Sequence, residues 1–102
     1  FSERRDYVVD RLKKMAGITV VKPSGAFYVY PNFSRFLEKR SHEKAIHTTL
    51  DIAAYLIENA GVAVVPGEAF GSTENIRISY ANSMENLRKA MDQIEAALCM
   101  LQ

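Results

Sequence analysis

Residues 75–81 read Asn-Ile-Arg-Ile-Ser-Tyr-Ala, and this stretch decides both the fold and the chemistry that we expect. Apolar and polar residues alternate, which is the pattern of a β-strand with one buried face. Ile76 and Ile78 would point to one face of a sheet, and Arg77 to the other. Burying a guanidinium without a partner costs several kcal/mol or more. We therefore expect Arg77 to face solvent, a carboxylate of the chain, or a ligand.

The neighbours of Arg77 on its own face favour a ligand. Ser79 and Ala81 are small, so they leave space around the guanidinium. A planar and permanently charged donor in an open site suits recognition of a carboxylate through two parallel hydrogen bonds. The position alone also fits an exposed strand arginine that only keeps a sheet edge soluble.

The bulk composition is that of an ordinary globular domain. The 102 residues are 48% apolar and 25% charged, and we expect one domain spanning 1–102. Thirteen basic and twelve acidic residues give a net charge of +1, which argues against nucleic-acid and membrane surfaces as partners. A single cysteine excludes an internal disulfide, and no Cys/His spacing indicates a metal site. With no long apolar run and no signal-peptide pattern, a cytoplasmic protein is expected.

Periodicity predicts seven elements in the order α-β-β-α-β-β-α. We expect a capping box between Thr48 and Asp51, a cap at Ser83, and helix ends at Gly17 and Gly61. The order predicts an α/β fold of the two-layer α+β type, with a mostly antiparallel, four-stranded small sheet and helices packed on one face. The predicted helices span 2–16, 48–60 and 83–101, and the predicted strands span 18–21, 26–30, 62–65 and 75–81.

The stretch 33–47 is the least regular and the most basic part of the chain. We expect a solvated loop here, with a short helix at 34–40 as an option. A patch that binds phosphate or an acidic partner is the second interpretation, although Glu38 and Glu43 dilute the basic residues.

No catalytic group is predicted from the residues themselves. His42 and His47 are five residues apart in the irregular stretch, which is poor spacing for a shared metal ion, and we expect both at the surface. The six lysines fall at predicted surface positions, so none is expected in the apolar pocket that imine chemistry requires. On this reasoning the chain is a binding domain with one well-placed arginine.

Four motifs in order give the chain a family resemblance. They are Phe-x-x-Arg-Arg-Asp at 1–6, Pro-x-Gly-Ala-Phe-Tyr at 23–28, Gly-Val-Ala-Val-Val-Pro-Gly-x-Ala-Phe-Gly at 61–71, and Ile-Arg-Ile-Ser-Tyr-Ala at 76–81. Together they resemble the carboxy-terminal small domain of fold-type I aminotransferases that use pyridoxal phosphate, the aspartate aminotransferase family. The resemblance covers nearly the whole chain apart from 33–47, and the chain looks like a piece cut from a longer protein.

The resemblance implies which residues bind substrate. In the family, the arginine of the last strand pairs with the substrate α-carboxylate, and this role maps onto Arg77. Gly67 and Phe70 match the loop at the mouth of the active site, and Phe27 matches an aromatic position near it. The Schiff-base lysine and the residues that hold the cofactor belong to the large domain, which this chain lacks. The isolated chain is therefore expected to bind no pyridoxal phosphate and to be inactive.

Three functions remain open at this point. The first is the carboxylate-binding domain of an aminotransferase that acts as a homodimer on an amino acid, most readily aspartate, and on 2-oxoglutarate; alanine, aromatic and lyase-type relatives remain open. The second is a stand-alone regulatory module that binds amino acids without catalysis. The third is a structural interaction domain in which Arg77 only decorates the surface.

Overall fold

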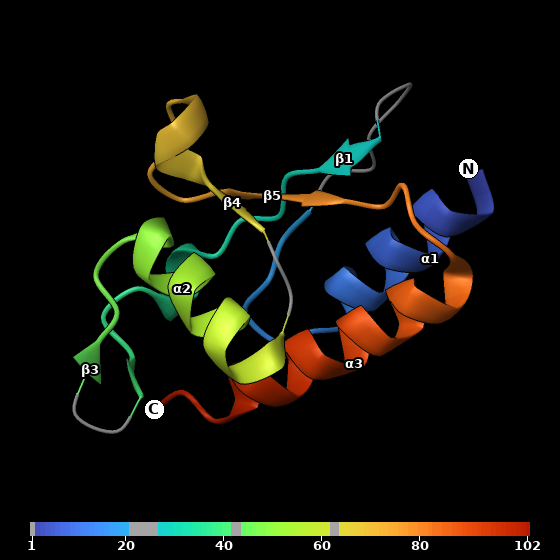
Figure 1. Cartoon of the computed structure of the whole chain (residues 1–102). Helices are drawn as coiled ribbons and strands as arrows, with labels where there is room; N and C mark the ends of the chain where they lie inside the picture. Colours follow the sequence, from blue (N-terminus) through green and yellow to red (C-terminus); the bar gives the residue numbers. More distant parts are fainter. Residues whose placement is uncertain (1, 21–26, 42–43, 62–63) are drawn as a thin grey trace.

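The computed structural model describes residues 2–20, 27–41, 44–61 and 64–102. It contains three α-helices, two short 3₁₀ helices and five short strands within these ranges (Figure 1). The helices are α1 (Ser2–Lys13), α2 (Thr49–Ala60) and α3 (Met84–Cys99), and the 3₁₀ helices are η1 (Ser34–Phe36) and η2 (Gly67–Phe70). The strands are β1 (Tyr28–Val29), β2 (Arg40–Ser41), β3 (Lys44–Ala45), β4 (Val65–Pro66) and β5 (Ile76–Ser79).

The main sheet has three antiparallel strands in the order β1-β5-β4, so the predicted four-stranded sheet is not confirmed. The strand predicted at 18–21 is reduced to one bridge, in which Thr19 pairs with Asn32. Asn32 in turn bridges to Asn75, just before β5. β-Branched residues favour a strand, but a continuous ladder also needs a partner in register, and only Thr19 has one among the described residues of this segment. Val21 lies outside the described residues.

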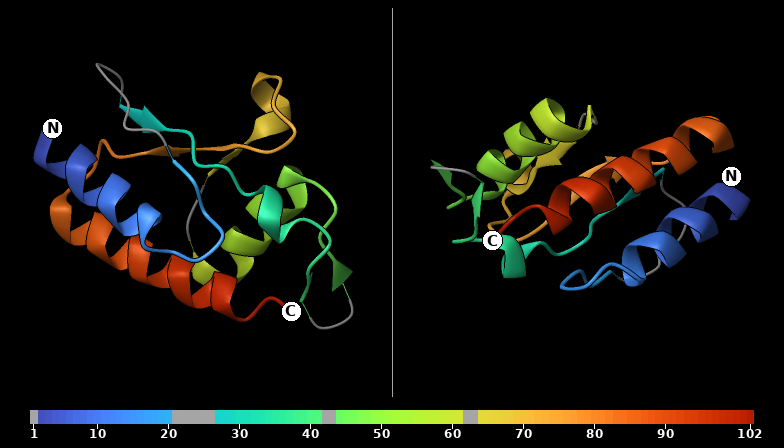
Figure 2. Two further views of the ribbon diagram at one scale, coloured as in Figure 1. Left: turned by 180° about the vertical axis from the view of Figure 1, so that it is seen from behind. Right: turned by 90° about the horizontal axis from the view of Figure 1, so that it is seen from below.

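The helices lie on one face of the sheet, which confirms the predicted two-layer arrangement. Figure 1 shows the sheet above α1, α2 and α3, and Figure 2 shows α3 running between the other two helices. The strand that decides the fold occupies the centre of the sheet. Ile76 and Ile78 are buried toward the helices, while Arg77 is half-buried and lies on the opposite face. The alternation in 75–81 therefore holds in the structure.

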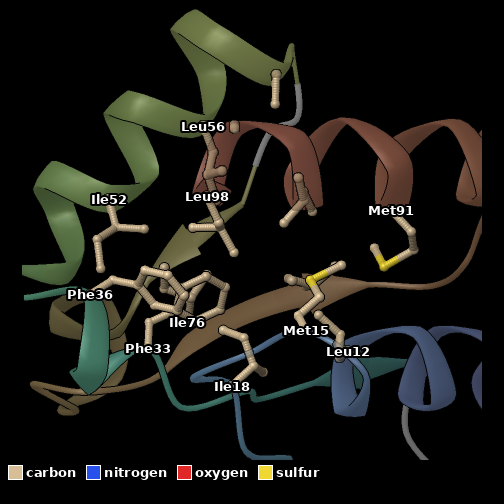
Figure 3. Close-up of a cluster of buried hydrophobic side chains, with 14 of the residues drawn as sticks. Leu12, Met15, Ile18, Phe33, Phe36, Ile52, Leu56, Ile76, Met91 and Leu98 are labelled. Atoms are coloured by element: carbon tan, nitrogen blue, oxygen red, sulfur yellow. The ribbon is translucent and has the colours of Figure 1, made fainter. Parts of the chain in front are cut away.

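The core fills the space between the sheet and the three helices (Figure 3). Each helix contributes a stripe of apolar residues three or four positions apart, and β5 contributes its two isoleucines. Removing these side chains from water is the main favourable term in folding. The fully buried apolar side chains include Leu12 from α1, Ile52 and Leu56 from α2, Met91 and Ile94 from α3, and Ile76 from β5.

The helix ends confirm the predicted caps, with one shift. The Thr48 side chain accepts a hydrogen bond from the Asp51 N–H, the Asp51 carboxylate accepts from the Thr48 N–H, and Gly61 closes α2 with φ of 65°. Ser83 caps α3 through one hydrogen bond, which its side chain accepts from the Asn86 N–H. The first helix ends at Lys13 rather than at 16, because its last residues tighten into i→i+3 hydrogen bonds before Gly17 turns the chain with φ of 88°.

The prediction of a solvated loop at 33–47 is wrong for much of its length. Phe33, Phe36 and Ile46 are buried in the core, and η1 holds the two phenylalanine rings 5.9 Å apart. Strands β2 and β3 then pair antiparallel. Phe33 and Phe36 are three positions apart among basic residues. The free energy gained by burying two aromatic side chains decides the structure here, although the residues around them are polar. The short helix predicted as an option at 34–40 is present only as η1, which spans Ser34–Phe36.

Candidate functional site

Arg77 sits at the centre of the uncovered sheet face. Val65 of β4 lies directly opposite it on one side, and Tyr28 of β1 pairs with Ser79 on the other side. In an antiparallel sheet, paired residues point to the same face. Val65, Tyr28 and Ser79 therefore share the face of Arg77, away from the three helices.

The guanidinium of Arg77 rests on an aromatic ring and not on a carboxylate. Its central carbon lies 4.5 Å from the centroid of the Tyr28 ring, within the range of a cation–π interaction. Its Nε is buried and has no hydrogen-bond partner. Within the part of the chain that the structure describes, no acidic side chain forms an ion pair with Arg77. A buried donor without a partner is costly and rare in native structures, so the unpaired Nε of Arg77 calls for a physical explanation.

The loop that follows β4 comes close to the backbone next to β5 at Gly67. A Cβ added to Gly67 would lie 2.3 Å from the backbone oxygen of Asn75 and 2.5 Å from that of Ser72. Neither oxygen can move without moving the chain, so only glycine fits here. Gly67 is buried, and its carbonyl accepts a hydrogen bond of 2.8 Å from the Ser72 N–H, which closes the loop.

A buried threonine anchors the same loop to α2. Thr49 is fully buried, and its hydroxyl accepts a hydrogen bond of 3.0 Å from the Gly67 N–H. The hydroxyl also donates to the carboxylate of Glu68. This bond from Thr49 is the main cause that lowers the pKa of Glu68 below its ordinary value. The first turn of α2 therefore holds the loop that follows β4, the strand that pairs with β5 opposite Arg77.

The structure places the predicted site residues in different surroundings. Phe70 is part-exposed at the end of η2, and its ring packs edge-on against Tyr30 at 5.5 Å. Tyr30 follows Tyr28 by two residues, so Phe70 contacts the strand segment that also carries Tyr28. Gly67 supports the loop but is itself buried.

Phe27 is not brought together with Arg77. The carbonyl of Phe27 accepts a hydrogen bond from the N–H of Tyr80, and the two rings lie 6.5 Å apart. Tyr80 is buried on the helix side of the sheet. The register therefore places Phe27, which is half-exposed, on the side opposite Arg77.

Tyr28 is the contact that sequence reasoning missed. The signal was present, because Tyr28 and Tyr30 alternate with buried Val29 and must share a face. Only the register with β5 shows that this face is the one that carries Arg77. That pairing joins residues about fifty positions apart, and strand alternation alone does not determine it.

The remaining polar groups assemble no second site among the described residues. His47 bonds Glu38 at 3.0 Å on the surface, and His42 lies outside the described residues. No group of three potential metal ligands occurs in 2–20, 27–41, 44–61 or 64–102. The single cysteine, Cys99, is exposed. In the same ranges, no helix is long and apolar enough to cross a bilayer.

Two hollows lie away from Arg77. One of about 210 Å³ is lined by Met15, Phe36 and Leu98 among others, and one of about 350 Å³ runs along α3 to the end of β5. Arg77 lines neither of them.

Comparison with known proteins identifies the family of the chain. A family model described as "Aminotransferase class I and II" matches residues 1–94. An aspartate aminotransferase of Pinus pinaster is 41% identical over 102 residues, which are 99% of this chain and 21% of the relative. A probable aspartate/prephenate aminotransferase of Aquifex aeolicus is 44% identical over 98 residues, covering 96% of this chain and 23% of the relative.

Solved structures give the same result. The aspartate aminotransferase of Rhizobium meliloti matches with a TM-score of 0.96 and 43% identity, over 99% of this chain and 26% of that one. An alanine aminotransferase of Pyrococcus furiosus matches with a TM-score of 0.82 and 30% identity, over 96% of this chain and 23% of that one. The chain spans about a quarter of the length of these relatives. It belongs to the class I and II aminotransferase family.

Proposed function

We propose that the chain is the carboxy-terminal small domain of a pyridoxal-phosphate aminotransferase, in which Arg77 binds the α-carboxylate of the substrate. One observation supports this role above all. The guanidinium lies half-buried on the open face of the sheet, and its Nε is buried without a hydrogen-bond partner. A substrate carboxylate on the terminal nitrogens would supply hydrogen-bond acceptors and the opposite charge together.

The energetics favour a ligand over a structural role. An arginine that only solubilises a sheet edge keeps its donors in water, whereas here one donor is out of water and unpaired. Charge-assisted, two-point pairing with a carboxylate offsets that cost and also fixes the orientation of the ligand. The proposed task of Arg77 is therefore to hold the substrate in one orientation while other groups perform the reaction.

The cofactor is assigned to the rest of the protein. A lysine that forms an imine needs an apolar pocket that lowers its pKa. Lys13, Lys14 and Lys89 are exposed, and Lys39 is half-buried over the ring of Phe36. Among the side chains that the structure describes, no lysine therefore fits as the residue that forms the imine with pyridoxal phosphate. When bound, the cofactor supplies the electron sink for loss of the α-proton.

For the substrate we propose an amino acid, with aspartate preferred, and 2-oxoglutarate as the acceptor. Two of the relatives are named aspartate aminotransferase and probable aspartate/prephenate aminotransferase, which supports aspartate. A solved relative is named alanine aminotransferase and is less similar in sequence. The proposal extends to a homodimer in the cytoplasm, which rests on the family resemblance and on the ordinary composition.

The alternative of a stand-alone regulatory module is not favoured. The chain belongs to an enzyme family, and it matches only 21% and 23% of the length of two relatives. A regulatory module would bind amino acids by itself, so isothermal titration of the isolated chain with aspartate separates the two functions.

Arg77→Ala in the full-length protein tests the proposal. Removing the charge-assisted pair should cost about 3 kcal/mol of transition-state binding, which lowers kcat/KM about 100-fold and raises KM. Arg35→Ala is the matched control, because Arg35 is exposed on η1 in the helical layer. An unchanged kcat/KM for Arg77→Ala, or an equal loss for both variants, would refute the assignment.

A further inference from the structure

We infer that Tyr28 is a positioning residue for carboxylate binding, because its ring holds the guanidinium of Arg77 in the orientation that presents its donors to the ligand. The inference rests on the proposed function of Arg77 and adds a second residue to it. It starts from the cation–π contact between the two side chains, in which the central carbon of the guanidinium lies 4.5 Å from the centroid of the Tyr28 ring.

The register of the sheet places Tyr28 and Arg77 close enough to make this contact. Tyr28 pairs with Ser79, which is two residues from Arg77 on β5. Diagonal neighbours of this kind lie roughly 7–8 Å apart, within reach of a ring and a guanidinium. Val65 stands directly opposite Arg77 on the other strand. The arginine is thus confined between a branched aliphatic side chain and an aromatic ring.

A ring is a suitable support for an arginine that must bind an anion. All five N–H donors of a guanidinium lie in its plane, whereas the ring attracts the cation through its π-face. With the ring of Tyr28 as its support and its Nε buried, the guanidinium keeps its terminal N–H groups for a ligand, while a carboxylate of the chain in the same place would occupy them. Restraining the side chain before binding also removes part of the ordering cost of the complex.

The ring, and not the hydroxyl, makes the described contact. Tyr28 is 37% exposed, so a smaller side chain at this position leaves no sealed cavity. Phenylalanine keeps the ring without the hydroxyl, and leucine keeps an apolar side chain without a π-system. Threonine keeps only the preference for a β-strand. The three substitutions separate the effect of the ring from the effects of size and of the hydroxyl.

The experiment uses the full-length protein with its cofactor and measures the Kd of succinate, an unreactive dicarboxylate, by isothermal titration. Tyr28→Phe should bind within about twofold of the wild type. Tyr28→Leu and Tyr28→Thr should bind about three- to tenfold more weakly, as expected for the loss of one cation–π contact. In an Arg77→Met background, Tyr28→Leu should cause no further loss, because the ring acts through the arginine.

Tyr7→Leu is the matched control. Tyr7 of α1 also stacks with arginines, at 5.8 Å from Arg11 and 5.9 Å from Arg88, but it lies in the helical layer on the other side of the sheet (Figure 1). Its loss should lower Tm and leave the Kd of succinate unchanged. The change is therefore chemically equivalent to Tyr28→Leu but remote from Arg77.

Each outcome distinguishes the two proposals. If succinate does not bind, or binds the wild type and Arg77→Met equally, the proposed function fails and the inference fails with it. If Arg77→Met weakens binding while Tyr28→Leu does not, or if Tyr28→Phe is as weak as Tyr28→Leu, only the inference is overturned. Loss of the folded state in both Tyr28→Leu and Tyr28→Thr would also overturn it, because Tyr28 would then be a residue of the fold.

Discussion

Thr49→Val should destabilise the chain through one buried hydrogen bond. The substitution preserves shape and replaces the hydroxyl with a methyl group. The Gly67 N–H, which donates to that hydroxyl at 3.0 Å, would then stay buried without a partner. Leaving a buried donor unsatisfied costs about 1–3 kcal/mol, so we expect a loss of about 2 kcal/mol in the free energy of unfolding. The exposed carboxylate of Glu68 regains water and adds little.

Urea unfolding followed by circular dichroism measures this loss. With a slope between 1 and 2 kcal/mol per M, typical of a chain of this size, the midpoint should fall by roughly 1–2 M. The reasoning would be refuted by a Thr49→Val midpoint equal to that of the wild type.

The same variant has a second, independent readout in the titration of Glu68. The bond from Thr49 is the main cause that lowers the Glu68 pKa in the folded state. Because the folded pKa is the lower one, the small contribution of Glu68 to stability is present above the ordinary pKa and is lost as the pH falls through the lowered one. In Thr49→Val the pKa should move up toward its ordinary value of 4.5. Thr49→Ser keeps the hydroxyl and should keep the lowered pKa. Carboxyl chemical shifts followed by NMR measure both.

Three further predictions concern the loop and the start of α2. Gly67→Ala places a Cβ at 2.3 Å from the backbone oxygen of Asn75, so we expect a loss of about 2 kcal/mol or more in urea unfolding; an unchanged midpoint would contradict the close approach. Thr48→Ala removes half of the capping box and should cost about 1 kcal/mol, seen as a lower Tm, with Thr48→Ser retaining most of the stability. Hydrogen bonds from the backbone N–H groups of His47 and Thr48 lower the pKa of Asp51, so this stabilisation is present above the ordinary pKa of 3.8 and is lost as the pH falls through the lower folded value. An NMR titration with Asp51 at or above 3.8 would contradict the described bonds.

Sequence patterns correctly predicted the features that depend on residues close together in the chain. The capping box at Thr48 and the positive φ at Gly61 depend on residues within one turn of each other, so their sequence patterns predicted α2 correctly. The alternation around Arg77 likewise predicted the two faces of β5, because successive side chains of a strand must point apart.

Errors occurred where distant partners decide the structure. The strand predicted at 18–21 has the right residues, but the described part of it finds a partner only at Thr19. The stretch 33–47 has a loop-like composition, yet Phe33 and Phe36 are buried because the core has room for two rings between the sheet and α2 (Figure 3). Composition describes a segment by itself and cannot show that the core has space for its side chains.

By itself, the order of residues determined the three helices, the central strand and the face to which Arg77 points, since each follows from periodicity and from caps within a few positions. Only the tertiary structure decided what surrounds that arginine. The register of β1 against β5 places Tyr28 beneath the guanidinium and turns Phe27 to the opposite side, and the Thr49 anchor holds the loop at Gly67 beside β5. These contacts join segments 18 to about 50 residues apart, and a shift of one residue in the register of β1 against β5 would reverse which side chains meet.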